Sequence, residues 1–507
     1  MIQKLINSKS LKANITANLT GNIFIALVSI VCVPIYLKYI GAEGYALIGI
    51  FSSMQVFLSI LDGGLATTIN KEISRLIVLP NTKQRVNNLV KTLGSVYWVI
   101  SIIIGIVAIC ASLFLAKYWV NSKLLTTETI TYSFLLLSLS LIFQFPSSFY
   151  SGGLIGLHRQ VPLNLLKIFF SILRSFGAII VLIFTSNSLL AFFTWTLLIN
   201  ILQALSLKYM IWYFLPHSET KGTFDTKELV EVRKFSIGIF GISLTSILLT
   251  QIDKIILSKI LSLEQFGYYS ISCTIGLMIY QIITPLAQSY FPKFSNLISL
   301  NKIEDLKNTY HQACQLMSLF IFPATLILMF FSKELIFIWT KNIVITENTW
   351  LVTSIYAFGT GVNGLMNIPY FLTISYGWTK LGLYQNILLL MIMTPLTIYL
   401  SLKYGVLGGA ISWAIVNSLT FFVVPYVIHD KFLKGEAFNW YVKDIAVPMF
   451  ISIVIIFFGR QFLFATIYSR WVELSLIILL GIISVLGVLP FLTSLRGNIF
   501  KLIKVKW

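Results

Sequence analysis

The sequence predicts an all-α integral membrane protein with about fourteen transmembrane helices. Of its 507 residues, 57% are hydrophobic and only 11% are charged, whereas soluble domains carry about 25% charged residues. The apolar residues are grouped in stretches of about 20, the length that an α-helix needs to cross a hydrocarbon core. The approximate centres of these stretches are Val28, Val56, Ile104, Leu137, Arg174, Thr196, Leu248, Met278, Leu326, Gly361, Met391, Ile415, Val454 and Leu480.

A second observation is an internal repeat at an offset of about 221 residues. The positions that recur are Lys38, Glu43 and Tyr45 with Lys259, Glu264 and Phe266, and, within two residues of that offset, Tyr150, Gly156 and Asn164 with Tyr370, Gly377 and Asn386. Repeats of this kind in transporters pack around a substrate site. We therefore expect two six-helix repeats around a central cavity, in the same orientation, plus two C-terminal helices.

The third observation is the distribution of charge, which predicts orientation and domain order. The net charge is +19, and most of the lysines and arginines fall on one side of the predicted spans. By the positive-inside rule this side is cytoplasmic, with both termini there. We expect a first six-helix bundle at residues 1–215, a cytoplasmic connector at 216–234, a second bundle at 235–430, and two extra C-terminal helices with a basic tail at 431–507. No soluble basic domain is present that would favour nucleic acid.

The fifth predicted span contains the residues that most need an explanation. Its sequence, "LLKIFFSILRSFGAIIVLIF", places Arg174 near the middle of the membrane, where a charge costs about 2.5 to 3.5 kcal/mol. Asn164, Lys167 and Arg174 lie on one helical face, since they are spaced at close to 3.6 residues per turn. This face predicts a polar surface turned away from lipid.

Polar stripes with the same spacing recur in four other spans. They are Ser52, Gln55, Ser59 and Asp62; Ser243, Ser246, Thr250, Asp253 and Lys254; Thr274, Gln281 and Gln288; and Thr360, Asn363, Asn367 and Tyr370. Each stripe alone is also typical of hydrogen bonding between helices. Together with Arg174 they favour a water-accessible cavity, and we expect Ser52, Gln55, Thr250, Gln281, Asn363 and Asn367 to face one shared space.

The sequence offers no sign of a cofactor or metal site. "GTGVNG", residues 359–364, matches a dinucleotide-binding pattern, but that pattern acts in a βαβ unit, and here we expect the glycines to allow close helix packing. His158, His217, His311 and His429 are scattered without metal spacing, so we expect them at the surface.

Several segments together resemble a known family. They are "PIYLKYIGAEGYALIGI", "LDGGLATTINKEISR", "GLIGLHRQVPLNLLKI", "TQIDKIILSKILSLEQFGYYSIS", "SKELIFIWT" and "LKYGVLGGAISW". They are similar to the polysaccharide-biosynthesis (O-antigen or capsule repeat-unit) flippases of the multidrug/oligosaccharidyl-lipid/polysaccharide exporter superfamily. The resemblance implies two bundles around a cavity in the bacterial inner membrane. It also implies a non-enzymatic transporter that flips undecaprenyl-diphosphate-linked oligosaccharides, with polysaccharide polymerase and chain-length proteins as partners.

The chemistry of the spans helps to choose among functions. A diphosphate headgroup is anionic and suits the cations Arg174 and Lys167. An exporter of cationic drugs would instead need buried carboxylates, and the candidates are Asp253 and Asp62 near span ends, with Lys254 beside the first. The remaining alternatives are a peptidoglycan-precursor flippase, a nontransporting membrane scaffold and a glycan polymerase. For Arg174 itself, a structural ion pair with Asp253 or Asp62 is the alternative to a substrate role.

Overall fold

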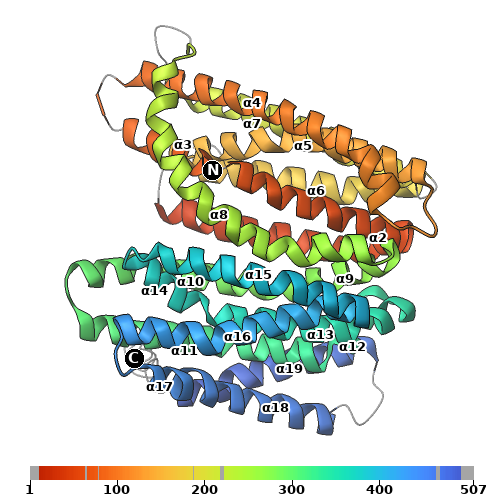
Figure 1. Cartoon of the computed structure of the whole chain (residues 1–507), viewed down its shortest axis with the longest axis vertical. Helices are drawn as coiled ribbons and strands as arrows, with labels where there is room; N and C mark the ends of the chain where they lie inside the picture. The colour runs from red at the N-terminus through yellow and green to blue at the C-terminus, as the bar shows by residue number, and fades with distance from the viewer. Residues whose placement is uncertain are drawn as a thin grey trace. The chain divides into compact units, whose positions relative to one another are not determined.

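The regular secondary structure of the chain is helical (Figure 1). The computed structural model describes residues 11–62, 65–77, 79–80, 82–185, 188–216, 222–463 and 469–492. Within these ranges the one extended pairing outside the helices is an isolated parallel bridge between Asn121 and Ser262.

The helices belong to two compact units. Unit 1 comprises Met1–Lys254 and Ser262–Gly267, and unit 2 comprises Ile255–Leu261 and Tyr268–Trp507. Two helices, α8 (Thr226–Ile260) and α9 (Leu263–Gly276), therefore contribute to both units.

Unit 1 is a bundle built around α5. Its helices before α8 are α2 (Leu11–Asp62), α3 (Leu65–Leu76), α4 (Lys83–Phe114), α5 (Thr127–Gly156), α6 (Gln160–Phe184) and α7 (Leu189–Phe214). Helix α5 packs against α3, α4 and α7, while α6 packs against α2 and α7. Glycines allow α3 to approach α5 closely: a Cβ atom on Gly152 would lie 2.4 Å from the Ala66 carbonyl oxygen, and one on Gly156 would lie 2.8 Å from that of Asn70.

Unit 2 is a bundle built around α13. Its helices after α9 are α10 (Tyr280–Ser299), α11 (Ile303–Phe330), α12 (Ser332–Thr340), α13 (Ile343–Leu365), α14 (Asn367–Ser375), α15 (Thr379–Tyr404), α16 (Val406–Phe432), α17 (Ala437–Asn439), α18 (Val447–Leu463) and α19 (Arg470–Val488). Helix α13 packs against α11, α12 and α16, and α15 packs against α16. The last two long helices, α18 and α19, pack against each other and against α11.

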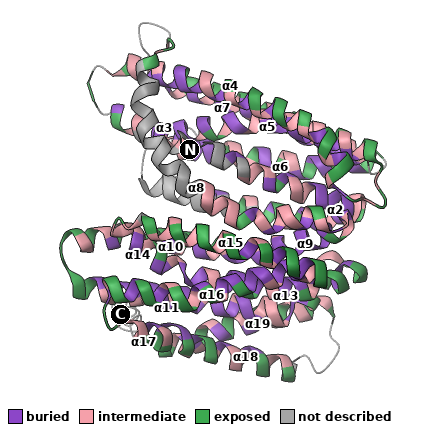
Figure 2. Cartoon of the chain, viewed as in Figure 1, coloured by how far each residue is buried: buried purple, intermediate pink, exposed green. Residues whose placement is uncertain are grey.

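The outer faces of the bundles are apolar. On α4, for example, Ile103, Val107 and Leu113 are each more than half exposed, and Figure 2 shows an exposed stripe along this helix. Water-exposed surfaces of this kind are unfavourable in a soluble monomer, whereas a helix with an apolar outer face and internally satisfied backbone groups suits lipid. The faces therefore indicate a membrane environment.

Eleven helices in the described part of the chain are long and apolar enough to cross a membrane. The stretches centred on Val28 and Val56, predicted as two spans, lie on either side of the kink that joins two helices within α2. The stretches around Leu248 and Gly361 lie in α8 and α13, which are helical but are not among the eleven. The predicted all-α membrane fold is confirmed, while the number fourteen stays a prediction.

Helix α2 is bent at Gly41, whose φ of 68° and ψ of −175° are not helical. Glycine adopts this backbone conformation without the penalty that a Cβ atom imposes. Next to the bend, the buried carboxylate of Glu43 accepts hydrogen bonds from the Ser122 hydroxyl and from the backbone N–H groups of Lys123, Leu124 and Leu125. This carboxylate fixes the loop between α4 and α5 on the bend.

The two bundles share an order of packing. In unit 1, α4 packs on α5, α5 on α7 and α6 on α7; in unit 2, α11 packs on α13, α13 on α16 and α15 on α16. Each helix of the second set begins about 220 residues after its counterpart in the first. The expected like orientation of the two halves and the predicted domain boundaries stay predictions. Helix α8 already begins at Thr226, inside the predicted connector 216–234.

Candidate functional site

Unit 1 contains a polar cavity of about 450 Å³ that lies among α3, α5, α6 and α7. Both predicted cations of α6, Lys167 and Arg174, line it. The other lining residues are Ala66, Asn70, Gln144, Ser147, Ser148, Ser151, Gly152, Ile155, Asn200 and Gln203. No aspartate or glutamate is among these residues, so the lining carries positive charge only.

Two amides of α7 hold the guanidinium of Arg174. Its Nη2 atom donates to Asn200 Oδ1 at 2.8 Å and to Gln203 Oε1 at 2.5 Å. Asn200 and Gln203 are three residues apart on one face of their helix, which lets both oxygens reach the same nitrogen. Within the described residues Nη1 makes no hydrogen bond, and the buried Nε has none either. The arginine is thus positioned by neutral groups that leave its charge uncompensated.

The alternative to a substrate role for Arg174 was a structural ion pair with Asp253 or Asp62. Among the side chains that the structure describes, no carboxylate lies within 4.0 Å of the Arg174 guanidinium, and the side chain of Asp62 is outside the described residues. Asp253 is 1% exposed on α8. A buried cation without a carboxylate attracts anions more strongly than a paired one, because nothing nearby cancels its field.

Lys167 and Asn164 have different surroundings, although they share the predicted stripe. Lys167 lies two turns before Arg174, lines the same cavity and has no hydrogen-bond partner among the described residues. Asn164 is 4% exposed, donates to the Gln160 carbonyl oxygen at 2.8 Å and packs against Gly21 of α2. It is not among the residues that line the cavity.

The amide groups on α3, α5 and α7 were not predicted as site residues. The missed residues that line the cavity with a side-chain amide are Asn70, Gln144, Asn200 and Gln203. Their spacing carried a signal: Gln144, Ser147, Ser148 and Ser151 repeat at three and four residues on α5, as Asn200 and Gln203 do on α7. The sequence alone does not tell which helices turn these faces toward Arg174.

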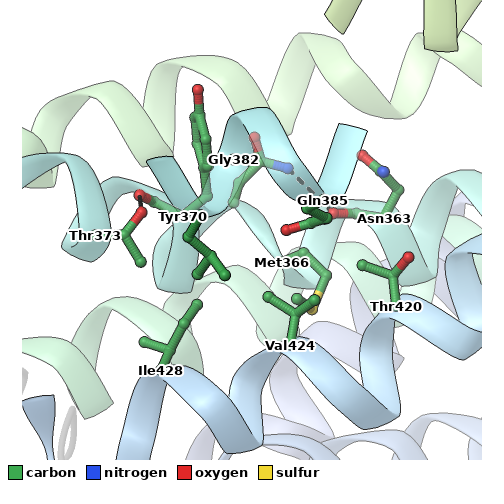
Figure 3. Close-up of a pocket in the computed structure, with 11 residues that line it drawn as sticks. Asn363, Met366, Tyr370, Thr373, Gly382, Gln385, Thr420, Val424 and Ile428 are labelled. Atoms are coloured by element: carbon green, nitrogen blue, oxygen red, sulfur yellow. Dashed lines mark hydrogen bonds between the residues drawn. The ribbon is translucent and has the colours of Figure 1, made fainter. Parts of the chain in front are cut away.

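Unit 2 contains a second, smaller cavity of about 150 Å³ among α13, α14, α15 and α16 (Figure 3). The predicted residues Asn363 and Asn367 line it. The other lining residues are Met366, Tyr370, Thr373, Leu381, Gly382, Gln385, Thr420, Val424 and Ile428. All of these side chains are uncharged, in contrast to the lining of the unit 1 cavity.

Asn363 is fixed between two other helices. Its Oδ1 accepts a hydrogen bond from the Tyr280 hydroxyl, and its Nδ2 donates to Asn417 Oδ1 at 2.6 Å. Asn367 donates to the backbone oxygens of Asn363 and Gly364, each at 3.2 Å. Asn363 therefore also forms hydrogen bonds between helices, which was the alternative explanation for its polar stripe.

Other predicted site residues lie outside these two cavities. Gln55 is half-buried on α2, Gln281 is exposed on α10, and neither is among the lining residues. Lys254 donates to Gln251 Oε1 at 3.3 Å, one turn earlier on α8. A space shared by the two halves, which these residues were expected to face, stays a prediction.

Two other expectations have clear outcomes. The glycines of "GTGVNG" do allow close packing. A Cβ atom would lie 2.7 Å from Trp413 if placed on Gly359, 2.3 Å from Thr325 if placed on Gly361, and 2.5 Å from Ile283 if placed on Gly364.

The expected surface position is wrong for two histidines. His429 is 1% exposed, and the side chain of His311, 12% exposed, contacts Asp444. Spacing along the sequence did not reveal the carboxylate that a distant helix supplies.

The fold of the chain is similar to the folds of solved multi-pass membrane transport proteins. The chain superposes on the lipid II flippase MurJ in an inward closed conformation with a TM-score of 0.73 at 16% identity, over 95% of this chain and 99% of that one. It superposes on an inward-facing multidrug resistance MATE family transporter of the MOP superfamily with a TM-score of 0.64 at 14% identity, over 80% and 95% of the two chains. Identities this low establish the fold alone.

The sequence itself identifies the family. Residues 79–342, more than half of the chain, match the family described as "Polysaccharide biosynthesis protein", and the chain belongs to this family. A relative called "Putative O-antigen transporter" from Shigella flexneri is 26% identical over 164 residues. That alignment spans 32% of this chain and 38% of the relative, so it covers well under two thirds of the relative's length. The family predicted from the sequence segments is confirmed.

Proposed function

We propose that this protein translocates lipid-linked oligosaccharides with a diphosphate headgroup across the bacterial inner membrane. The substrates would be undecaprenyl-diphosphate-linked repeat units of O-antigen or another surface polysaccharide, moved by alternating access of a polar cavity. Membership of the polysaccharide biosynthesis family supports this proposal, as does the name of the Shigella flexneri relative. Both termini would lie in the cytoplasm, and a polysaccharide polymerase and chain-length proteins would be partners.

The observation that carries the proposal is the cation pair in the unit 1 cavity. Lys167 and Arg174 both line it, and Arg174 is held by amides instead of a carboxylate. A diphosphate needs cations and hydrogen-bond donors in place of its lost water, and a guanidinium offers donors in a planar fork. Because Nη1 is not engaged by the described residues, it remains available to a phosphate oxygen.

The charge of this lining also distinguishes the proposal from its alternatives. A cation-coupled exporter of cationic drugs would place positive ligands beside Lys167 and Arg174, where like charges repel. Neither of the two cavities described above is lined by an aspartate or glutamate. A nontransporting scaffold, in turn, would have no need of an uncompensated cation inside a span.

The test is a pair of substitutions in a cell whose surface glycan depends on this protein. Arg174→Gln keeps a polar side chain but removes the charge, and we expect surface glycan to fall by at least about a hundredfold at normal protein level. Arg174→Lys keeps the charge but loses the planar fork, so export should be partly restored. The matched control is Lys208→Gln, an exposed lysine on α7, which should export normally.

The outcomes separate the alternatives. Full export by Arg174→Gln would refute a substrate role and favour a scaffold. Loss of the protein from the membrane would favour a structural role for the arginine. Normal glycan export together with impaired efflux of a cationic dye would favour the drug exporter.

A further inference from the structure

The cavity of unit 2 contains polar groups that its own fold does not use. Gln385 lines it from α15, and its side-chain amide makes no hydrogen bond to a described residue. Among the described residues the Tyr370 hydroxyl makes no hydrogen bond, and the Oδ1 atom of Asn367 accepts none. None of these atoms is among the buried polar atoms that lack a partner, so they are accessible, and water or a bound ligand can pair with them.

The unused groups match an uncharged polyol. Together they offer the two N–H donors and the oxygen of a primary amide, a phenolic hydroxyl and a further amide oxygen. Neighbouring hydroxyls of a sugar ring need this mixture, because each hydroxyl both donates and accepts. An anion would find no cation among the lining residues, and a cationic ligand would find no carboxylate.

The rest of the cavity is apolar and includes an aromatic ring. Tyr370 lines the cavity and is 40% exposed, so part of its side chain is accessible. Figure 3 shows Val424 and Ile428 of α16 on the side of the cavity away from the polar groups of α13 to α15. A pyranose has C–H groups on its faces and hydroxyls on its edge, and an aromatic ring with a polar tip suits both.

The volume limits the size of the ligand. At about 150 Å³ the cavity is smaller than the sites of about 300 to 1,000 Å³ that hold drug-sized molecules. One monosaccharide ring fits this space, and an oligosaccharide does not.

We infer that the unit 2 cavity is a binding site for an uncharged monosaccharide, with Gln385 and Tyr370 as its principal contacts. That this sugar belongs to a lipid-linked glycan rests on the proposed function. The sugar site itself does not, since it depends only on the cavity of unit 2. The protein would thus recognise two chemically different parts of one substrate, the diphosphate in unit 1 and a neutral sugar in unit 2.

The experiment uses the full-length protein in detergent and saturation-transfer NMR with soluble methyl glycosides. The probes are methyl glucoside, methyl N-acetylglucosaminide and methyl rhamnoside, with methyl glucuronide as an anionic comparison. At least one neutral glycoside should bind with a Kd on the order of millimolar, and the glucuronide should bind more weakly. Gln385→Leu should weaken this binding by about tenfold, and Tyr370→Ala, at an exposed position that tolerates truncation, should do the same.

A second probe, inorganic pyrophosphate, keeps this inference apart from the proposed function. The wild-type protein and Gln385→Leu should bind it equally, whereas Arg174→Gln should not bind it but should retain the glycoside. Absence of glycoside binding by the wild type, or unchanged binding in both Gln385→Leu and Tyr370→Ala, would overturn the sugar site. Glycoside binding without pyrophosphate binding would support the sugar site and count against the proposed diphosphate substrate.

Discussion

Both bundles contain a polar cavity, lined by α5, α6 and α7 in unit 1 and by their counterparts α13, α15 and α16 in unit 2, yet one is cationic and the other is neutral. Counted from the first residues of α6 and α15, Lys167 and Arg174 correspond to Asn386 and Met393. Counted likewise on α7 and α16, Asn200 corresponds to Asn417. None of these three counterparts lines the unit 2 cavity, whose lining is neutral, whereas Lys167 and Arg174 give the unit 1 lining its charge.

Asn200 and Asn417 lie at corresponding positions but accept hydrogen bonds from different kinds of group. Asn200 accepts a hydrogen bond from the guanidinium of Arg174, whereas Asn417 accepts one from the amide of Asn363. A charge-assisted bond in a low-dielectric site is stronger than a bond between neutral amides. The same side chain therefore orients a buried cation in unit 1 and joins two helices in unit 2.

The strongest test of this comparison replaces the two cations of unit 1 by the residues at the corresponding positions of unit 2. In the double variant Lys167→Asn, Arg174→Met the cavity loses both charges, and we expect surface glycan export to be lost completely. The polar frame of Asn200 and Gln203 would remain but would have no cation to hold. The measurement is surface glycan per cell, normalised to the amount of protein in the membrane, with Met393→Leu in unit 2 as the control. Measurable export by the double variant would show that the cations do not decide the function.

A second difference between the units is a charged cluster that connects unit 2 to its additional helices. The buried carboxylate of Asp444, in the π-helical turn before α18, contacts His311 Nδ1 at 2.5 Å and accepts a bond from Gln315 Nε2 at 2.9 Å. Glu436 lies 3.3 Å from the other imidazole nitrogen. A hydrogen bond from Asn439 lowers the pKa of the Glu436 carboxyl, so this residue is charged at neutral pH.

Removing the central carboxylate should destabilise unit 2. Asp444→Leu removes the buried carboxylate that contacts His311 Nδ1 and Gln315 Nε2, and loss of one member of such a buried pair costs about 3 kcal/mol or more. The melting temperature of the detergent-solubilised protein should fall by several degrees. The double variant His311→Leu, Asp444→Leu should melt higher than Asp444→Leu, because it leaves no charge unpaired. An unchanged melting temperature in the single variant would contradict a structural role for the cluster.

The sequence predicted the properties that composition and periodicity determine. The all-α fold followed from apolar stretches of the right length, and Lys167 and Arg174 followed from the high cost of charge within such a stretch. The environment of these residues depended instead on which helices are neighbours. The amides of Asn200 and Gln203 were overlooked for this reason, and Asn164, on the predicted face, turned out to pack against α2.

The same limit explains the errors at single positions. His311 was expected at the surface because no second ligand lies at metal spacing from it in the sequence. Its partner Asp444 comes from a turn far along the chain. No such error applies to α2, which consists of two helices joined across the kink at Gly41, with the two stretches predicted as spans on either side of it.

A smaller effect is expected where the partner of the cation is changed and the cation is kept. Asn200→Leu removes one of the two acceptors of Arg174, so the guanidinium loses part of its orientation, and export should fall about tenfold. Its counterpart Asn417→Leu should lower the melting temperature but leave pyrophosphate affinity unchanged. Equal changes of pyrophosphate affinity in both variants would mean that Asn200 has no greater effect on anion binding than Asn417.

The smallest effect should follow from exchanging one neutral lining residue for another. Ser151 of α5 corresponds to Asn367, counted from the first residues of α5 and α13, and both line the cavity of their own unit. Ser151→Asn therefore gives unit 1 the neutral side chain of unit 2 while Lys167 and Arg174 stay in place. Since the cavity of about 450 Å³ has room for the larger amide, export should change by less than about threefold. The rate of surface glycan appearance after induced expression measures this directly. A loss as large as that of Arg174→Gln would mean that the shape of the lining, and not its charge, separates the two cavities.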